Sequence, residues 1–222
     1  MSHPSSLQGV ALFFRQLILN PREVGAFAPS SKRLGDAMAR WLEGGEHGAV
    51  LELGPGTGAI THSLMQAGLA SERLIGIEQS REMTSLLRDR FPRSQFIEGD
   101  ALRVTDTLRR HYKRIPRFSR VFSGLPLLNF PPRVRADLFR QLRDLLEPGG
   151  KVIQFSYRLN RGHDYESFQQ CGHKFVWLNF PPARVSVYES TLKKARPSIR
   201  MQEASPDFGS AKGRTEAERT EI

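Results

Sequence analysis

Short apolar runs alternate with amphipathic segments through the middle of this chain. Residues 49–53, 73–78 and 95–98 are apolar runs of strand length. The segments between them, 59–67 and 83–91, carry apolar side chains at helical spacing. This order predicts a βαβαβ unit whose strands lie parallel in one sheet.

The remaining patterned segments extend this sheet. We expect, in chain order, a basic helix over about 101–114, a strand at 120–123, a helix at 131–146, a turn at 147–150 and a strand at 151–157. Residues 174–180 and 184–190 alternate like two further strands around a Pro-Pro pair, which is consistent with a closing hairpin. The pattern therefore predicts an α/β fold with a seven-stranded, mostly parallel sheet that includes an antiparallel C-terminal hairpin strand.

The first twenty residues form an amphipathic pattern of their own. Apolar side chains recur there at spacings of three and four residues, at Leu7, Val10, Ala11, Phe14, Leu17 and Ile18. The stretch is too short and too interrupted to span a bilayer, and it lacks the basic start and cleavage site of a signal peptide. It can pack on the core or lie in the membrane interface, and the neighbouring Phe13 and Phe14 favour the membrane.

Length and charge narrow the classes of protein further. The chain has 222 residues, which favours one domain with extensions, and its single cysteine, Cys171, excludes a disulfide framework. The net charge of +10 favours a polyanionic partner, either nucleic acid or an acidic membrane surface. Seven basic residues form the densest cluster, namely Arg103, Arg109, Arg110, Lys113, Arg114, Arg117 and Arg120. This cluster is a solvated face, a contact for anionic lipid headgroups, or a contact for RNA phosphates.

Glycines follow the first expected strand at positions 54, 56 and 58. Glycines between a strand and a helix allow a tight turn and a close approach of the backbone to a ligand. Glu78 ends the second strand twenty residues after Gly58, the spacing at which a carboxylate in such folds reaches ribose hydroxyls. A dinucleotide loop would place its third glycine one residue later. No spacing typical of metal ligands occurs among the histidines, so we expect no metal.

The segment from Glu52 to Gly58, Glu-Leu-Gly-Pro-Gly-Thr-Gly, resembles the first motif of the class I S-adenosylmethionine methyltransferases, a Rossmann-like superfamily. The resemblance implies that this loop holds the methionine and ribose of the cofactor, which leaves as S-adenosylhomocysteine. It also implies that the acid after the second strand holds the ribose and that Asp100, after the third, holds the adenine amino group. The cofactor residues implied in this way are Ser30, Ser31, Glu52, Gly54, Pro55, Gly56, Thr57, Gly58, Glu78, Gln79, Ser80, Asp100, Ala101, Ser123, Gly124 and Leu125.

The segment after the fourth strand, Ser-Gly-Leu-Pro-Leu-Leu-Asn-Phe-Pro at 123–131, stands where amino-methylating enzymes of this superfamily carry a polar residue and a stacking aromatic. Gly124 and Leu127 replace these two residues here. A flipped base needs stacking surface and hydrogen-bond partners, and this loop supplies little of either. Its apolar side chains, Leu125, Leu127, Leu128 and Phe130, suit acyl or glycerol carbons better.

Together with the segments at 21–31 and 154–157, this loop is similar to the bacterial phospholipid N-methyltransferases of the rhizobial type, over roughly residues 7–190. The scaffold of that family is similar to that of the ribosomal RNA adenine dimethyltransferases. The resemblance implies methylation of phosphatidylethanolamine toward phosphatidylcholine by an enzyme attached peripherally to the cytoplasmic membrane. It implies membrane phospholipids and an anionic membrane surface as partners, with no nucleic acid and no protein partner inferred.

On this basis we expect a membrane-binding helix and lid segment at 1–40, a methyltransferase domain at 41–195 and a disordered polar tail at 196–222. Tyr157 and His163 are candidates to accept or relay the proton of the lipid amine, and Asn129 is a candidate to hold that amine or to cap the following helix. Three alternatives stay open: methylation of adenine in ribosomal RNA, methylation of another amino lipid such as an ornithine lipid, and cofactor binding without transfer.

Overall fold

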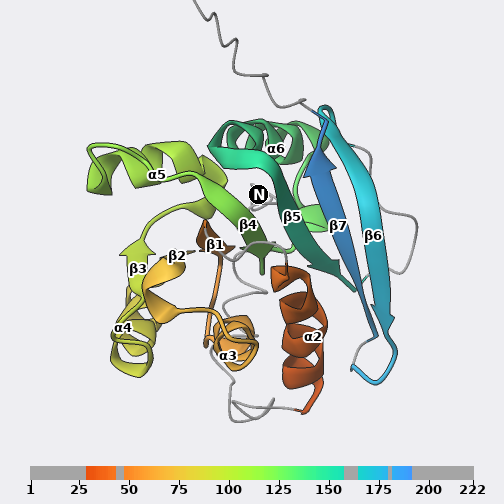
Figure 1. Cartoon of the computed structure of the whole chain (residues 1–222), viewed down its shortest axis with the longest axis horizontal. Helices are drawn as coiled ribbons and strands as arrows, with labels where there is room; N and C mark the ends of the chain where they lie inside the picture. The colour runs from red at the N-terminus through yellow and green to blue at the C-terminus, as the bar shows by residue number, and fades with distance from the viewer. Residues whose placement is uncertain (1–28, 44–47, 158–164, 180–181, 192–222) are drawn as a thin grey trace, which may run out of the picture.

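The computed structural model describes residues 29–43, 48–157, 165–179 and 182–191. Its seven strands form one sheet in the order β3-β2-β1-β4-β5-β7-β6 (Figure 1). The strands β1 to β5 are parallel to one another, and β7 is antiparallel to both β5 and β6. The elements are α2 (Pro29–Ala39), η1 (Arg40–Leu42), β1 (Ala49–Leu53), α3 (Ala59–Gln66), η2 (Ser71–Arg73), β2 (Leu74–Glu78), α4 (Arg81–Arg90), β3 (Gln95–Glu98), η3 (Ala101–Arg103), α5 (Val104–His111), β4 (Phe118–Ser123), η4 (Leu127–Asn129), α6 (Pro132–Leu145), β5 (Leu146–Ser156), β6 (Phe168–Val176) and β7 (Ala183–Ser190).

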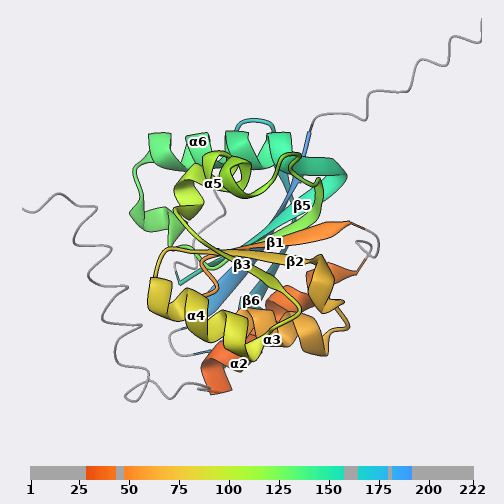
Figure 2. The ribbon, with the colours of Figure 1, turned by 90° about the vertical axis from the view of Figure 1, so that its left-hand side faces the viewer.

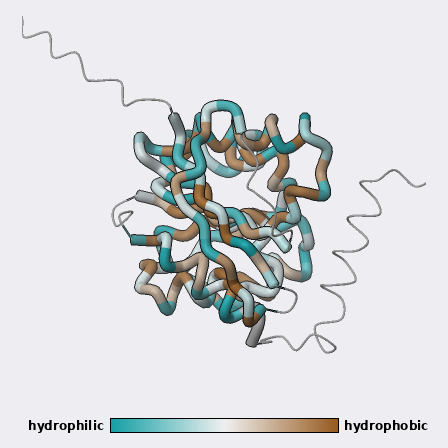
Figure 3. Tube along the Cα trace, turned by 90° about the vertical axis from the view of Figure 1, so that its right-hand side faces the viewer, coloured by the Kyte–Doolittle hydropathy of each residue, from teal (hydrophilic) through white to brown (hydrophobic). Residues whose placement is uncertain are grey.

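Helices cover both faces of the sheet, with α5 and α6 on one side and α2, α3 and α4 on the other (Figure 2). Successive strand residues point to opposite faces, so Val121 packs with the α5 and α6 cluster while Phe122 packs with the other cluster. Both side chains are fully buried, which explains why the central strands read as nearly continuous apolar runs. Apolar stretches of the chain accordingly run through the middle of the molecule in Figure 3.

The predicted fold class is confirmed, but several boundaries differ. The strand expected at 174–180 is β6, which begins at Phe168 and ends at Val176, because its pairing with β7 extends back from Val176 to Phe168. The turn expected at 147–150 lies within the span of β5, where the register with β4 shifts and Gly149 adopts a φ of +79°. The helix expected to reach residue 114 ends at His111, and α2 is a helix that the sequence pattern does not reveal.

Other expectations concern segments outside this description. The N-terminal amphipathic helix and the tail from residue 196 both lie outside the described residues. Within the ranges that the structure describes, no helix combines the length and the apolarity that crossing a membrane requires.

Candidate active site

The loops that follow β1, β2, β3 and β4 meet at one edge of the sheet, because the carboxyl ends of parallel strands point the same way. Backbone hydrogen bonds join them just beyond the strands. The Gly54 N–H donates to the Ile77 carbonyl at 2.9 Å, the Gly124 N–H to the Leu53 carbonyl at 2.8 Å and the Gly99 N–H to the Glu78 carbonyl at 2.9 Å. We call this edge of the sheet, where Gly54, Gly99 and Gly124 lie, the glycine-loop edge.

The glycines of the loop after β1 are required for two different reasons. Gly54, Gly56 and Gly58 all have positive φ, at +66°, +56° and +83°, which L side chains adopt only with strain. A Cβ on Gly54 would lie 2.9 Å from Leu125 Cδ2, so the loop after β4 presses on this position. A Cβ on Gly56 would have nothing within 4 Å, so open space for a ligand adjoins this backbone.

Glu78, at the end of β2, fastens this loop. One carboxylate oxygen, Oε2, accepts the Gly56 N–H at 2.9 Å, and Oε1 accepts the Ser80 N–H at 3.0 Å, with the side chain only 6% exposed. Because each carboxylate oxygen has two lone pairs, both can still accept a further hydrogen bond. Glu78 therefore holds the loop and keeps acceptors available for two hydroxyl groups.

Glu52 lies in the middle of the sheet and is fully buried. Its Oε2 accepts the Thr61 hydroxyl at 2.7 Å, while Oε1 has no hydrogen-bond partner among the described residues. Burial raises the pKa of this carboxyl to about 7. An unpartnered buried acceptor beside a glycine loop is a feature that a cationic or N–H-bearing ligand group would satisfy. With Gly56 and Glu78, it fits the expected S-adenosylmethionine.

Asp100 follows β3 and begins the short helix η3. Its Oδ1 accepts the Leu102 N–H at 2.8 Å, and its carbonyl accepts the Thr107 hydroxyl at 3.1 Å. Ala101 beside it is buried, whereas Gln79 on the neighbouring loop is exposed. The acid is thus fixed in place at the same edge as Glu78.

The loop after β4 packs against the glycine loop and against β5. The Leu125 N–H donates to the buried Ser123 Oγ at 3.4 Å, and the Leu125 carbonyl accepts from Gln154 Nε2 at 2.8 Å. Leu127 is 1% exposed and packs in the α5 and α6 cluster. It is therefore a core residue, and the expectation that it contacts the substrate was wrong. Asn129 is exposed, and Pro131 takes the N-cap position of α6, so the capping alternative for Asn129 was wrong.

The other candidates are placed only in part. Tyr157 directly follows β5, is 45% exposed, and packs edge-on against Phe155 at 5.4 Å between ring centroids. Partial burial raises the pKa of its phenol, so the group stays protonated at neutral pH. His163 lies outside the described residues, as do the side chains of Ser30 and Ser31.

The basic cluster is divided by the fold. Arg120 is 4% exposed and donates to the carbonyls of Trp41, Ser119 and Glu43 at 2.9, 2.8 and 2.7 Å, so its assignment to a surface cluster was wrong. These three backbone acceptors satisfy donors of the buried guanidinium. The other six basic side chains are exposed.

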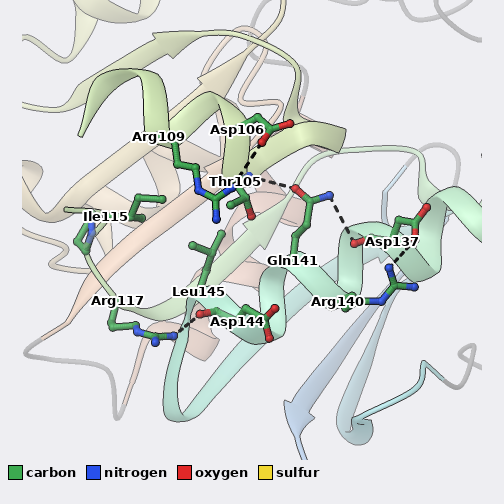
Figure 4. A pocket seen from close by; sticks show the side chains of 11 residues that line it. Thr105, Asp106, Arg109, Ile115, Arg117, Asp137, Arg140, Gln141, Asp144 and Leu145 are labelled. Atoms are coloured by element: carbon green, nitrogen blue, oxygen red, sulfur yellow. Dashed lines mark hydrogen bonds and ion pairs between the residues drawn. The ribbon is translucent and has the colours of Figure 1, made fainter. Parts of the chain in front are cut away.

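A cavity of about 650 Å³ lies between α5 and α6, on the face of the sheet that these helices cover (Figure 4). Arginines line it, but each faces an acceptor. Arg109 lies 3.9 Å from Asp106, Arg140 lies 2.9 Å from Asp137, and Arg117 donates to the Asp144 carbonyl. This balance of charge gives the cavity no marked preference for an anion.

The sequence analysis missed two residues of the site. Thr61 holds Glu52, and Gln154 holds the loop after β4. Gln154 had a signal in the sequence, because it is the one polar side chain in the run Val-Ile-Gln-Phe of β5. Thr61 had none, because a threonine on an amphipathic helix is ordinary.

Comparisons with known proteins give a consistent result. A family model described as a methyltransferase domain matches residues 50–150. The chain is 32% identical over 178 residues to the ornithine lipid N-methyltransferase of Singulisphaera acidiphila, covering 78% of this chain and 91% of that protein. A stretch of 58 residues is 43% identical to ribosomal RNA small subunit methyltransferase A of Synechococcus sp., covering 25% of this chain and 20% of that enzyme.

Solved structures share the fold. Magnesium protoporphyrin IX methyltransferase of Synechocystis PCC 6803, with bound S-adenosylmethionine, superposes with a TM-score of 0.62 at 13% identity, covering 86% of this chain and 99% of that one. The N-methyltransferase NodS of Bradyrhizobium japonicum, in complex with S-adenosylhomocysteine, gives 0.60 at 14% identity, covering 85% and 100%.

Proposed function

This chain belongs to the class I S-adenosylmethionine-dependent methyltransferases, and on that premise we propose that it methylates the amine of a membrane lipid at the membrane surface. Phosphatidylethanolamine and its mono- and dimethyl forms are the proposed substrates, with phosphatidylcholine as the end product. We further propose that the protein attaches peripherally to the inner face of the cytoplasmic membrane through its N-terminal segment.

One observation carries the choice of a lipid over a nucleobase. A Cβ at position 124 would lie 2.5 Å from the Gly54 carbonyl oxygen, so this backbone accepts no side chain there. An amide or carboxylate that could grip the edge of a flipped base is therefore excluded at 124, and the buried Leu127 offers no stacking surface. Leu125 and Phe130, both partly buried, leave the loop apolar.

S-adenosylmethionine, when bound, supplies a methyl group activated by a sulfonium. We propose that the glycine loop and Glu78 hold its ribose end, that Glu52 accepts from its amino acid part, and that Asp100 and Ala101 border the adenine. Ser123, Gly124 and Leu125 would close the pocket from the β4 side. The protein's main task is then to align the lipid amine and exclude water.

The amine must be neutral when it attacks, because an alkylammonium has no lone pair. A primary alkylamine titrates near pH 10.4, so one proton leaves for each methyl group transferred. We propose that Tyr157 relays this proton: its oxygen accepts the proton of the ammonium while its own hydroxyl proton passes to solvent water, which the 45% exposure of the side chain admits. Asn129, exposed in the loop after β4, would hold the amine through its side-chain oxygen.

An ornithine lipid is a second candidate substrate, since it also presents a primary amine. The 32% identity with an ornithine lipid N-methyltransferase over 91% of that protein favours it specifically. The matches to ribosomal RNA enzymes cover between 25% and 57% of this chain and at most 40% of those enzymes, so they support RNA as the substrate less than the lipid enzyme supports a lipid.

Transfer of labelled methyl groups from S-adenosylmethionine tests the proposal. Vesicles with phosphatidylethanolamine, vesicles with an ornithine lipid, vesicles with neither, and ribosomal RNA are incubated separately, and the products are separated by chromatography. We expect label in phosphatidylethanolamine and its methylated forms. Label in the ornithine lipid alone would move the assignment to the second candidate, and label in RNA alone would refute a lipid substrate.

A further inference from the structure

The turn between β6 and β7 exposes two adjacent large apolar side chains. Trp177 is 64% exposed and Leu178 is 73% exposed, more than the other large apolar side chains that stand out on the described surface, Tyr157 at 45% and Leu86 at 39%. Tryptophan is enriched where apolar and polar layers of a membrane meet, because its ring is apolar and its N–H is polar. We call residues 177–179 the hairpin tip.

The hairpin tip is held in place by its neighbours. The Trp177 ring stacks on Phe175 at 5.3 Å with 19° between the planes, and the Arg184 guanidinium lies 5.4 Å from the Phe175 ring centroid. The Leu178 carbonyl accepts from Arg33 of α2 at 2.9 Å. The apolar side chains are thus presented on a braced turn, which lowers the conformational cost of burying them elsewhere.

The tip lies at the same edge of the sheet as the glycine loop. Ser156, the last residue of β5, pairs with Arg184, and Val176 pairs with Ala183, so the turn after Val176 extends beyond the carboxyl end of β5. Figure 1 shows the β6–β7 turn beside the lower end of α2, past the tips of the β4 and β5 arrows. A surface that contacts the tip would therefore also face the loops that follow β1, β2 and β4.

The charge around the tip suits an anionic surface. Arg33 contacts the tip directly, Lys174 precedes it on β6, and no acidic residue occurs between Lys174 and Asn179. The chain as a whole carries a net charge of +10. Basic side chains beside exposed tryptophan and leucine are the combination that binds the headgroup layer of anionic membranes.

We propose that the hairpin tip inserts Trp177 and Leu178 into the interfacial layer of an anionic membrane and so holds the glycine-loop edge against the lipid headgroups. This inference rests on the proposed function, because an enzyme that methylates a lipid amine has to bring its active site to the membrane. The membrane contact itself does not require methyl transfer. The occupant of the tip is a bilayer surface, because two adjacent exposed apolar side chains, one of them tryptophan, lie beside the basic Arg33 and Lys174.

Fluorescence quenching by brominated lipids tests the contact directly. The vesicles contain equal parts of brominated phosphatidylcholine and phosphatidylglycerol and no amine lipid, so binding is measured without turnover. We expect the bromine atoms to quench the emission of Trp177 in the full-length protein. Trp41, the other tryptophan, packs against Gly172, and Trp177→Phe should therefore abolish most of the quenching.

A double variant measures the contribution to affinity. Trp177→Ser with Leu178→Ser should weaken vesicle binding by about tenfold or more, since two large apolar side chains no longer leave water. Leu86→Ser on α4, an exposed apolar residue remote from the tip, is the matched control and should bind as the wild type does. Unchanged binding of S-adenosylhomocysteine by both variants establishes that they are folded.

The outcomes separate this inference from the proposed function. Unchanged vesicle affinity of the double variant, or no loss of quenching in Trp177→Phe, overturns the contact even if the protein methylates a lipid. Quenching at Trp177 with no methylation of any lipid upholds the contact and refutes the substrate assignment. On short-chain lipid dispersed as monomers, the double variant should turn over like the wild type, and a loss there would overturn a role confined to the membrane surface.

Discussion

At the scale of single residues, the carboxylate of Glu78 has two duties, since it accepts the N–H groups of Gly56 and Ser80 and is proposed to accept the ribose hydroxyls. Glu78→Ala should weaken the affinity for S-adenosylhomocysteine by about tenfold to a hundredfold, because hydrogen bonds to a charged group contribute about 1.5–3 kcal/mol. Isothermal titration measures it. Glu72→Ala, which removes an exposed ion pair with Arg93, is the control and should change little. An unaltered affinity in Glu78→Ala would contradict the assignment.

Substitution of Gly124 and of Gly56 by alanine should have different effects on stability and on cofactor binding. Gly124→Ala forces its Cβ against a backbone oxygen and should lower the free energy of unfolding by about 1–3 kcal/mol. Gly56→Ala meets open space, so its cost in stability is the strain of a positive φ, about 1–2 kcal/mol, yet its methyl group occupies the ligand's space. Urea unfolding and cofactor titration on both variants separate the two effects. Full cofactor affinity in Gly56→Ala would argue against a ligand at that loop.

The buried Glu52 makes stability depend on pH. Its pKa is about 7 in the folded protein against an ordinary value of 4.5, so between these values the folded state binds more protons than the unfolded state. The free energy of unfolding of the cofactor-free protein should therefore fall as the pH rises from 4.5 to 7, by about 3 kcal/mol at most. Glu52→Gln keeps an acceptor for Thr61 and should remove this part of the fall. Urea unfolding at pH 5 and pH 7.5 measures the free energy of unfolding of both proteins. An identical change between the two pH values in the wild type and in Glu52→Gln would disprove the prediction.

At the scale of elements, the amphipathic segment before α2 is predicted to be the main membrane anchor. Deleting residues 1–20 should abolish sedimentation of the protein with vesicles and leave a core that still unfolds cooperatively, since no described strand or helix is removed. Far-UV circular dichroism during thermal unfolding provides the control. Unchanged vesicle binding by the shortened protein would refute the anchor and leave the hairpin tip as the principal contact.

The spacing of apolar residues does not give the ends of every strand or reveal every helix. The strand predicted at 174–180 extends past Val176 because Trp177 and Leu178 are apolar. Their spacing does not distinguish an exposed turn from the continuation of a strand. Backbone pairing with β7 sets the true end of β6. Conversely, α2 escapes detection although Leu34 and Met38 are buried at helical spacing, because its eleven residues carry few other apolar side chains.

At the scale of the whole molecule, the positive charge predicts that salt controls membrane binding. Binding to vesicles rich in phosphatidylglycerol should weaken as sodium chloride is raised, because screening shortens the range of attraction between the protein's net charge of +10 and the lipids. Binding to pure phosphatidylcholine, driven by apolar insertion, should change little. Vesicle sedimentation across a salt series measures both. Equal salt dependence on the two vesicle types would refute an electrostatic contribution.

From β1 onward the order of strands and helices was predictable from the sequence, as were the glycine loop and the acid after β2, because each rests on residues close together in the chain. Spacing of apolar residues reports burial locally, and the positive φ of Gly54, Gly56 and Gly58 is a local requirement that selects glycine. The methyltransferase fold and its cofactor were expected because the segment 52–58 resembles the first motif of the class I methyltransferases.

Only the tertiary structure decided what depends on distant contacts. Arg120 reads as a surface charge, but the fold brings the Trp41 and Glu43 carbonyls to it and buries it. The sequence predicts Leu127 as a substrate contact, but in the fold it is buried in the cluster that includes the apolar side chains of α6. Glycine is required at position 124 because the Gly54 carbonyl lies against it. The hairpin tip becomes a candidate membrane contact only once the pairing of β5 with β7 places it at the glycine-loop edge. A sequence records which side chains prefer burial, but which groups meet is determined by chain segments far apart in the sequence.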